Sequence, residues 1–218
     1  MFAATRLPTL SLGRLATGLP GAAGVLRRCG MTASAAPELP LAQAAAERAV
    51  SLPAILGALE DLAAQAGARS TWPTEDLIAY ILERYHAGHR ADVPVLRALA
   101  LDLANRIEAA PEPRELAQLI GAVDLAMEEH MRKEELRVFP MMLRGRHERL
   151  GEWIAFLRRE HEDAVPFVLR LEEVTQGYRA PADDGLWLRL YEELERFVED
   201  MVAHIYLEEQ VLFRRFAA

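Results

Sequence analysis

The sequence predicts an all-α protein: an up-down-up-down four-helix bundle with a small helical domain at its N-terminus. Beyond residue 71, four long segments repeat apolar residues at steps of three and four, which is the period of an amphipathic helix. Proline or glycine stands between consecutive segments. No stretch alternates apolar and polar residues as a half-buried strand does.

The composition excludes several classes of protein. The chain has 218 residues, 51% of them hydrophobic, so it can bury a sizeable core. No apolar stretch approaches the roughly 20 residues that cross a bilayer, so we expect no membrane association. A net charge of −8 argues against nucleic-acid binding. The single cysteine, Cys29, excludes a disulfide framework and fits a cytoplasmic location.

A domain boundary is expected just before residue 71. Residues 1–68 would form the N-terminal domain and residues 71–218 the bundle. In the N-terminal domain the pattern predicts helices at 20–29, 40–49 and 52–66, the last of which ends at Gly67. The four bundle helices are expected at about 74–108, 114–143, 147–176 and 186–216.

Pro94 and Pro166 fall inside two of these bundle helices. Each removes a helical hydrogen bond and favours a kink. Two interpretations are open: curvature of the helix around the core, or a pocket widened beside a functional site.

Each bundle helix carries a histidine on its apolar stripe. In the second helix His130 and Glu134 follow Leu116, Leu119, Val123 and Met127 at helical spacing, so both point into the bundle. The fourth helix repeats the pattern with His204 and Glu208, and the first and third helices contribute His86 and His161. Buried carboxylates are costly unless they are paired or bind a metal. The six residues together therefore predict a metal site.

A single histidine on an apolar stripe is more often a hydrogen-bonded core residue, and His89 is interpreted in that way or as a neighbour of the ligands. A bundle without metal would require the six inward polar residues to pair with one another. The set of two His-x-x-x-Glu motifs plus two further histidines favours metal binding instead.

The ligand types indicate which metal would bind. Imidazole and carboxylate, without sulfur, suit iron and similar ions, whereas a structural zinc site uses four ligands. Two octahedral ions need about twelve positions. Four histidines, two bridging glutamates and one oxo or hydroxo bridge fill about ten of them. About two positions remain open for a small molecule such as O2 or NO.

Two charged residues near these motifs are further candidates. Lys133 is the one lysine in a chain that otherwise uses arginine, and it lies within the motif from His130 to Glu135. It is either a compact charge near the mouth of the site or a chance occurrence. Glu160, which precedes His161, is a candidate for orienting an imidazole.

Ferritin-like sites use mostly glutamate with Glu-x-x-His spacing, whereas here histidine precedes glutamate and outnumbers it. Residues 75–216 resemble a hemerythrin-like (HHE) cation-binding domain and, more closely, the repair-of-iron-centres family of di-iron proteins. The matching stretches are Arg84–Arg90, His130–Glu135 with Val138–Pro140, Glu160–Glu162, and His204–Glu208 with Val211–Phe213.

The resemblance implies two iron ions, with His86, His130, His161 and His204 as terminal ligands and Glu134 and Glu208 as bridges. It also implies a role in repairing iron-sulfur clusters damaged by nitrosative or oxidative stress, with NO or O2 at open iron positions and damaged iron-sulfur proteins as partners. A homodimer is left open, as is whether the protein is an enzyme.

The sequence departs from these families at several positions. Val165 stands where oxygen-carrying hemerythrins have a second third-helix histidine, and this favours the repair family. The family's ligand histidine near the end of the first helix is absent from Asn105–Glu108, so Glu108 or water would replace it. The N-terminal Cys-Cys pair is replaced by Thr32–Ala35, and Cys29 lies too early to substitute for it.

Two alternative functions remain open. One is an NO-binding or NO-reducing di-iron protein, in which the chemistry takes place at the metals, and the missing thiols favour it. The other is a non-enzymatic O2 carrier or sensor, which the missing third-helix histidine argues against.

Overall fold

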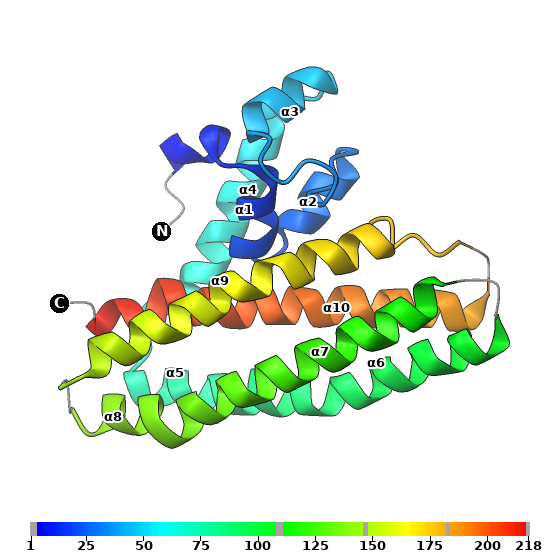
Figure 1. The fold of residues 1–218 in the computed structure, drawn as a ribbon. Helices are drawn as coiled ribbons and strands as arrows, with labels where there is room; N and C mark the ends of the chain where they lie inside the picture. Colours follow the sequence, from blue (N-terminus) through cyan, green and yellow to red (C-terminus); the bar gives the residue numbers. More distant parts are fainter. Residues whose placement is uncertain (1–3, 108–110, 146–147, 182–183, 217–218) are drawn as a thin grey trace.

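The computed structural model describes residues 4–107, 111–145, 148–181 and 184–216. Within these ranges the chain is helical, and its β-structure is limited to one isolated bridge between Ser11 and Pro40. Figure 1 shows a long bundle with a smaller helical unit lying across one side of it. No helix in the described ranges combines the length and the apolar character needed to cross a membrane.

The bundle contains four antiparallel rods, as predicted, and three of them are built from consecutive segments. The first is α5 (Thr74–Tyr80), η3 (Ile81–His86) and α6 (Ala87–Arg106). The second is α7 (Glu112–Lys133), η4 (Glu134–Val138) and α8 (Phe139–Leu143). The third is α9 (Leu150–Val174), and the fourth is α10 (Gly185–Leu207), η5 (Glu208–Leu212) and η6 (Phe213–Phe216).

The segments η3, η4 and η5 are π-helical, with wider turns than the α-helices on either side of them. The sequence pattern predicted continuous helices here and did not distinguish the π turns. Pro94 lies inside α6 and Pro166 inside α9, as expected.

Local signals in the sequence explain where the rods begin and end. The carboxylate of Asp184 accepts hydrogen bonds from the backbone N–H groups of Leu186 and Trp187, and this caps the start of α10. Gly145 follows α8 with φ +65°, a left-handed conformation that closes a helix end and that glycine adopts without strain.

Two apolar clusters fill the bundle on either side of a polar layer. One lies toward the α6–α7 connection and includes Leu103, Ile120, Leu190 and Phe197. The other lies toward α8 and includes Ile81, Phe139, Leu157 and Phe213. The histidines of the four rods lie between these two clusters.

The N-terminal unit consists of η1 (Ala4–Thr9), α1 (Leu12–Gly18), α2 (Ala22–Arg28), α3 (Leu41–Glu47), α4 (Leu52–Ala66) and η2 (Gly67–Thr71). Helices α2, α3 and α4 match the predicted ranges, but α1 was not predicted. Leu12 and Leu15 of this short helix are buried, and the side chain of Ser11 caps its start. The glycines and prolines around it obscured the helical periodicity of its apolar residues.

Candidate metal centre

The six predicted ligand residues come together in the polar layer of the bundle. His86 ends η3, Glu134 begins η4 and Glu208 begins η5, while His130, His161 and His204 lie on α7, α9 and α10. Both glutamates are fully buried, and the four imidazoles are between 1% and 8% exposed. Three of the six thus lie in π turns, which often occur at functional sites.

The two glutamates contact all four imidazoles. Oε2 of Glu134 lies 3.3 Å from Nε2 of His86, and its Oε1 lies 3.4 Å from Nε2 of His130. Oε2 of Glu208 lies 3.2 Å from Nε2 of His161, and its Oε1 lies 3.0 Å from Nε2 of His204.

These contacts divide the residues into two groups that share both carboxylates. The first group is His86, His204, Glu134 and Glu208, and the second is His130, His161, Glu134 and Glu208. Within each group, one potential ligand atom per residue lies within 4.8 Å of the others. Each glutamate therefore offers one oxygen to either group, as a bridging carboxylate would.

Unsatisfied polar atoms test whether the pocket fits a cation. In the described part of the chain, both carboxylate oxygens of Glu134, Oε2 of Glu208 and Nε2 of His86 are buried without a hydrogen bond. A buried carboxylate that makes no hydrogen bond costs free energy comparable to full desolvation. Bound cations would remove that cost, so the donor set fits a metal pair.

The electrostatics of the six residues point the same way. Burial would raise the pKa of Glu208, but contact with His204 and His161 holds it well below the usual range. Burial lowers the pKa of His130, but the carboxylates of Glu134 and Glu160 outweigh that effect and raise the pKa to about 10. The site thus concentrates negative charge that protons balance when no metal is present.

Three carboxylates hold the outer nitrogens of three imidazoles. Nδ1 of His86 lies 2.8 Å from Glu135, Nδ1 of His130 lies 3.0 Å from Glu160, and Nδ1 of His161 lies 2.9 Å from Glu209. The proposed orienting role of Glu160 has a geometric basis, although its partner is His130 on α7 and not the adjacent His161. Lys133 pairs with this same Glu160.

Sequence reasoning did not assign Glu135 or Glu209 a role. The available signal was that each directly follows a ligand glutamate, as a Glu-Glu pair. Helical periodicity identifies residues that point into the bundle, whereas Glu135 and Glu209 reach an imidazole from the side.

His89 is buried but joins neither group. Its ring lies 5.4 Å from the rings of His204 and Phe197, and burial, with the charges of His204 and His86, lowers its pKa to about 2. It is therefore a neutral packing residue that neighbours the proposed ligands, as one of the two interpretations expected. The other, a hydrogen-bonded core histidine, is not borne out, because its buried Nε2 has no hydrogen-bond partner among the described residues.

The predicted substitute ligand Glu108 lies outside the described residues. The described end of α6 is Arg106, 20 residues beyond His86, which places it about 30 Å away along the helix axis. Asn105 and Arg106 are therefore remote from the six residues.

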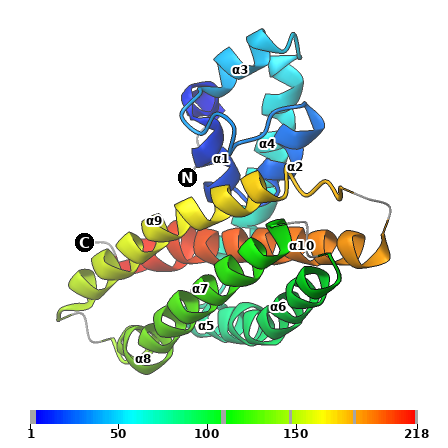
Figure 2. The same cartoon turned by 45° about the vertical axis from the view of Figure 1, so that its right-hand side comes forward.

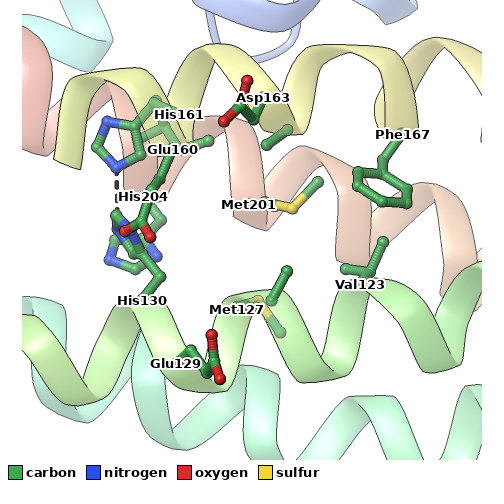
Figure 3. A pocket seen from close by; sticks show the side chains of 13 residues that line it. Val123, Met127, Glu129, His130, Glu160, His161, Asp163, Phe167, Met201 and His204 are labelled. Atoms are coloured by element: carbon green, nitrogen blue, oxygen red, sulfur yellow. Dashed lines mark hydrogen bonds and ion pairs between the residues drawn. The ribbon is translucent and has the colours of Figure 1, made fainter. Parts of the chain in front are cut away.

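A cavity of about 210 Å³ opens onto His130, His161 and His204. Figure 3 shows these histidines at one end, Val123 and Phe167 toward the other, and Met127 and Met201 between them. The mostly apolar lining suits a small neutral molecule better than an ion.

Comparison with known proteins identifies the family. Residues 77–216 match the model of the hemerythrin HHE cation binding domain. The chain therefore belongs to the hemerythrin HHE family, and its fold and buried His/Glu cluster agree with that membership.

Its relatives include the iron-sulfur cluster repair protein YtfE of Pectobacterium carotovorum subsp. carotovorum, which is 32% identical over 211 residues, covering 94% of this chain and 95% of that protein. Proteins of the same name are 32% identical in Salmonella paratyphi B, over 94% of each chain, and 29% identical in Musicola paradisiaca, over 94% of this chain and 95% of that protein. The resemblance to the repair family is thus confirmed, and it includes the N-terminal unit.

Proposed function

We propose that this protein takes part in the repair of iron-sulfur clusters damaged by nitrosative or oxidative stress, using a di-iron centre. The observation that carries the proposal is the pair of buried His/Glu groups that share Glu134 and Glu208. Near full-length similarity to proteins named for this repair supports the biological role. The proposed location is the cytoplasm, and the proposed partners are damaged iron-sulfur proteins.

In this proposal His86 and His204 would hold one iron, His130 and His161 would hold the other, and Glu134 and Glu208 would be shared by both. The iron pair, when bound, supplies one-electron redox change and open positions for NO or O2. The protein's own residues orient the imidazoles through Glu135, Glu160 and Glu209 and exclude water with the apolar clusters on both sides. A homodimer stays a prediction.

A second candidate function is NO binding or NO reduction at the same centre. The apolar cavity beside His130, His161 and His204 favours it, because a neutral diatomic molecule could reach the site through such a cavity. The absence of the Cys-Cys pair also favours chemistry confined to the metals. An O2 carrier or sensor is less well supported, because Val165 occupies the position of the extra histidine.

The test combines metal analysis with a repair assay. Iron, manganese and zinc per monomer are measured by mass spectrometry on protein purified without oxygen, and about two irons are expected. The loaded protein is then mixed with an iron-sulfur enzyme inactivated by NO, and the return of cluster absorbance and activity is followed. Steady production of N2O without reactivation would favour the second candidate, and zinc alone or no metal would overturn both.

A further inference from the structure

The four imidazoles differ in how their outer nitrogens are supported. The outer nitrogens of His86, His130 and His161 each bond to a carboxylate, and each carboxylate in turn pairs with a cation. Arg90 Nη1 lies 2.8 Å from Glu135 Oε1, Arg158 Nε lies 3.1 Å from Glu209 Oε2, and Lys133 pairs with Glu160. Three cation–carboxylate–imidazole chains therefore converge on the centre.

His204 has a different environment. Among the described residues, its hydrogen bonding is confined to Nε2, which contacts Glu208. Its ring stacks on Tyr85, with centroids 5.3 Å apart and planes 7° from parallel, and lies 4.9 Å from the ring of His86. Aromatic packing fixes this imidazole in place but supplies no negative charge to its outer nitrogen.

The difference matters because a carboxylate on the outer nitrogen strengthens an imidazole as a ligand. The N–H···O⁻ bond fixes the proton on Nδ1, leaves the lone pair of Nε2 for the metal and raises ligand basicity. Losing one such partner typically lowers metal affinity by roughly 10- to 100-fold. The His130–His161 group has two supported imidazoles, and the His86–His204 group has one.

We propose that the two metal positions bind with unequal affinity: the position at His130 and His161 retains its ion, and the position at His86 and His204 gives up its ion first. This inference rests on the proposed function, in that it assigns the source of any iron passed on to a damaged cluster. It concerns equilibrium affinity. The cavity beside His130, His161 and His204 governs access, and hence rates, and does not set the order of affinities.

Stepwise binding of Zn²⁺ to the metal-free full chain provides the test, with affinities measured by competition against a chromophoric chelator. Repulsion between two cations makes the second step weaker even in a symmetric site, so the variants carry the test. Glu209→Gln, which removes support from His161, is expected to weaken the first step by about 10- to 100-fold. Glu135→Gln, which removes support from His86, is expected to weaken the second step and leave the first unchanged.

Glu83→Gln is the matched control, because Glu83 is an exposed glutamate three residues before His86. It is expected to leave both steps unchanged. In protein with ¹⁵N-labelled histidine, the first equivalent of Zn²⁺ should shift the ring nitrogens of His130 and His161 before those of His86 and His204.

The reverse order of NMR shifts, or a first step weakened by Glu135→Gln as much as by Glu209→Gln, would overturn the inequality. That result would leave the repair function standing. Failure of the wild-type chain to bind two ions would instead remove the proposed di-iron function.

Discussion

Glu134 has an unusual environment for a carboxylate. Both of its oxygens are buried without a hydrogen bond, although the nitrogens of two imidazoles lie nearby. In the metal-free chain the protonated imidazole of His130 compensates its charge, and bound metal would take over that role. The side chain therefore needs a cation beside it in either state.

Substitution of the two carboxylates tests their role in metal binding. Glu134→Leu and Glu208→Leu are each expected to lose metal and to keep their helical content. In the metal-free state at pH 7 Glu134→Leu should be less stable than the wild type, by about 3 kcal/mol, because it removes a buried counter-charge from the protonated His130. Urea denaturation of both metal-free proteins measures the difference. Full iron occupancy in either variant would rule out the bridging assignment.

The protonation of His130 predicts how metal binding depends on pH. Its pKa in the metal-free site is raised to about 10, so the imidazole is protonated at pH 7 and must lose its proton to become a ligand. Affinity for Mn²⁺ should therefore rise with pH between 6 and 8. Calorimetry in two buffers of different ionisation enthalpy should show net proton release, and equal heats in both buffers would contradict the prediction.

The six inward residues could be predicted from the sequence because helical periodicity alone fixes which face they occupy. Their carboxylate partners could not, because a bond such as His130 to Glu160 depends on which two rods are neighbours and on the rotamers of both side chains. Lys133 stood out because it is the one lysine in the sequence, but its pairing with Glu160 was seen only in the structure.

At the scale of single elements, the ends of the rods followed from the prolines and glycines between segments, of which Gly145 is one, whereas the cap at Asp184 was recognised only in the structure. The π segments did not, because apolar residues at steps of three and four also match a helix with one widened turn. The short helix α1 was missed for a different reason: its stability comes from burying Leu12 and Leu15, which is a tertiary effect.

The cap of α10 gives a prediction for an element. Asp184→Ala removes the acceptor for two backbone N–H groups at the start of the helix that carries His204. We expect a loss of about 1 kcal/mol in the free energy of unfolding, with a fall of about 2–4 °C in melting temperature. The exposed Asp102→Ala on α6 is the control, and an equal loss in that variant would argue against a capping role.

At the scale of the whole molecule, a largely buried ion pair between Arg27 and Glu172 links the N-terminal unit to the bundle. Glu172 on α9 accepts hydrogen bonds from Arg27 and from the backbone N–H of Ser34, and Arg27 also pairs with Glu195. The guanidinium of Arg27 lies 5.0 Å from the ring centroid of Tyr178. Figure 2 shows the unit resting against α9 and α10, a placement the sequence did not specify.

Breaking this contact should loosen one part of the chain and leave the rest intact. Glu172→Gln leaves Arg27 with a weaker buried partner, and we expect a local cost of about 3 kcal/mol. Hydrogen exchange should accelerate in α1 to α3 while α7 and α10 stay protected, and metal content should be unchanged. The neighbouring, exposed Glu173→Gln is the matched control. Uniform acceleration across the bundle would show that Glu172 supports the whole fold.

The three π segments have a consequence for how such chains are compared. A wide turn accommodates one residue more than an α-helical path of the same length, and η3 ends at a proposed ligand whereas η4 and η5 begin at one. An alignment that assumes continuous α-helices would therefore be displaced by one residue beyond each π segment. Relatives placed in register by their histidines and glutamates should instead show single-residue gaps beside the ligands wherever a wide turn has been lost.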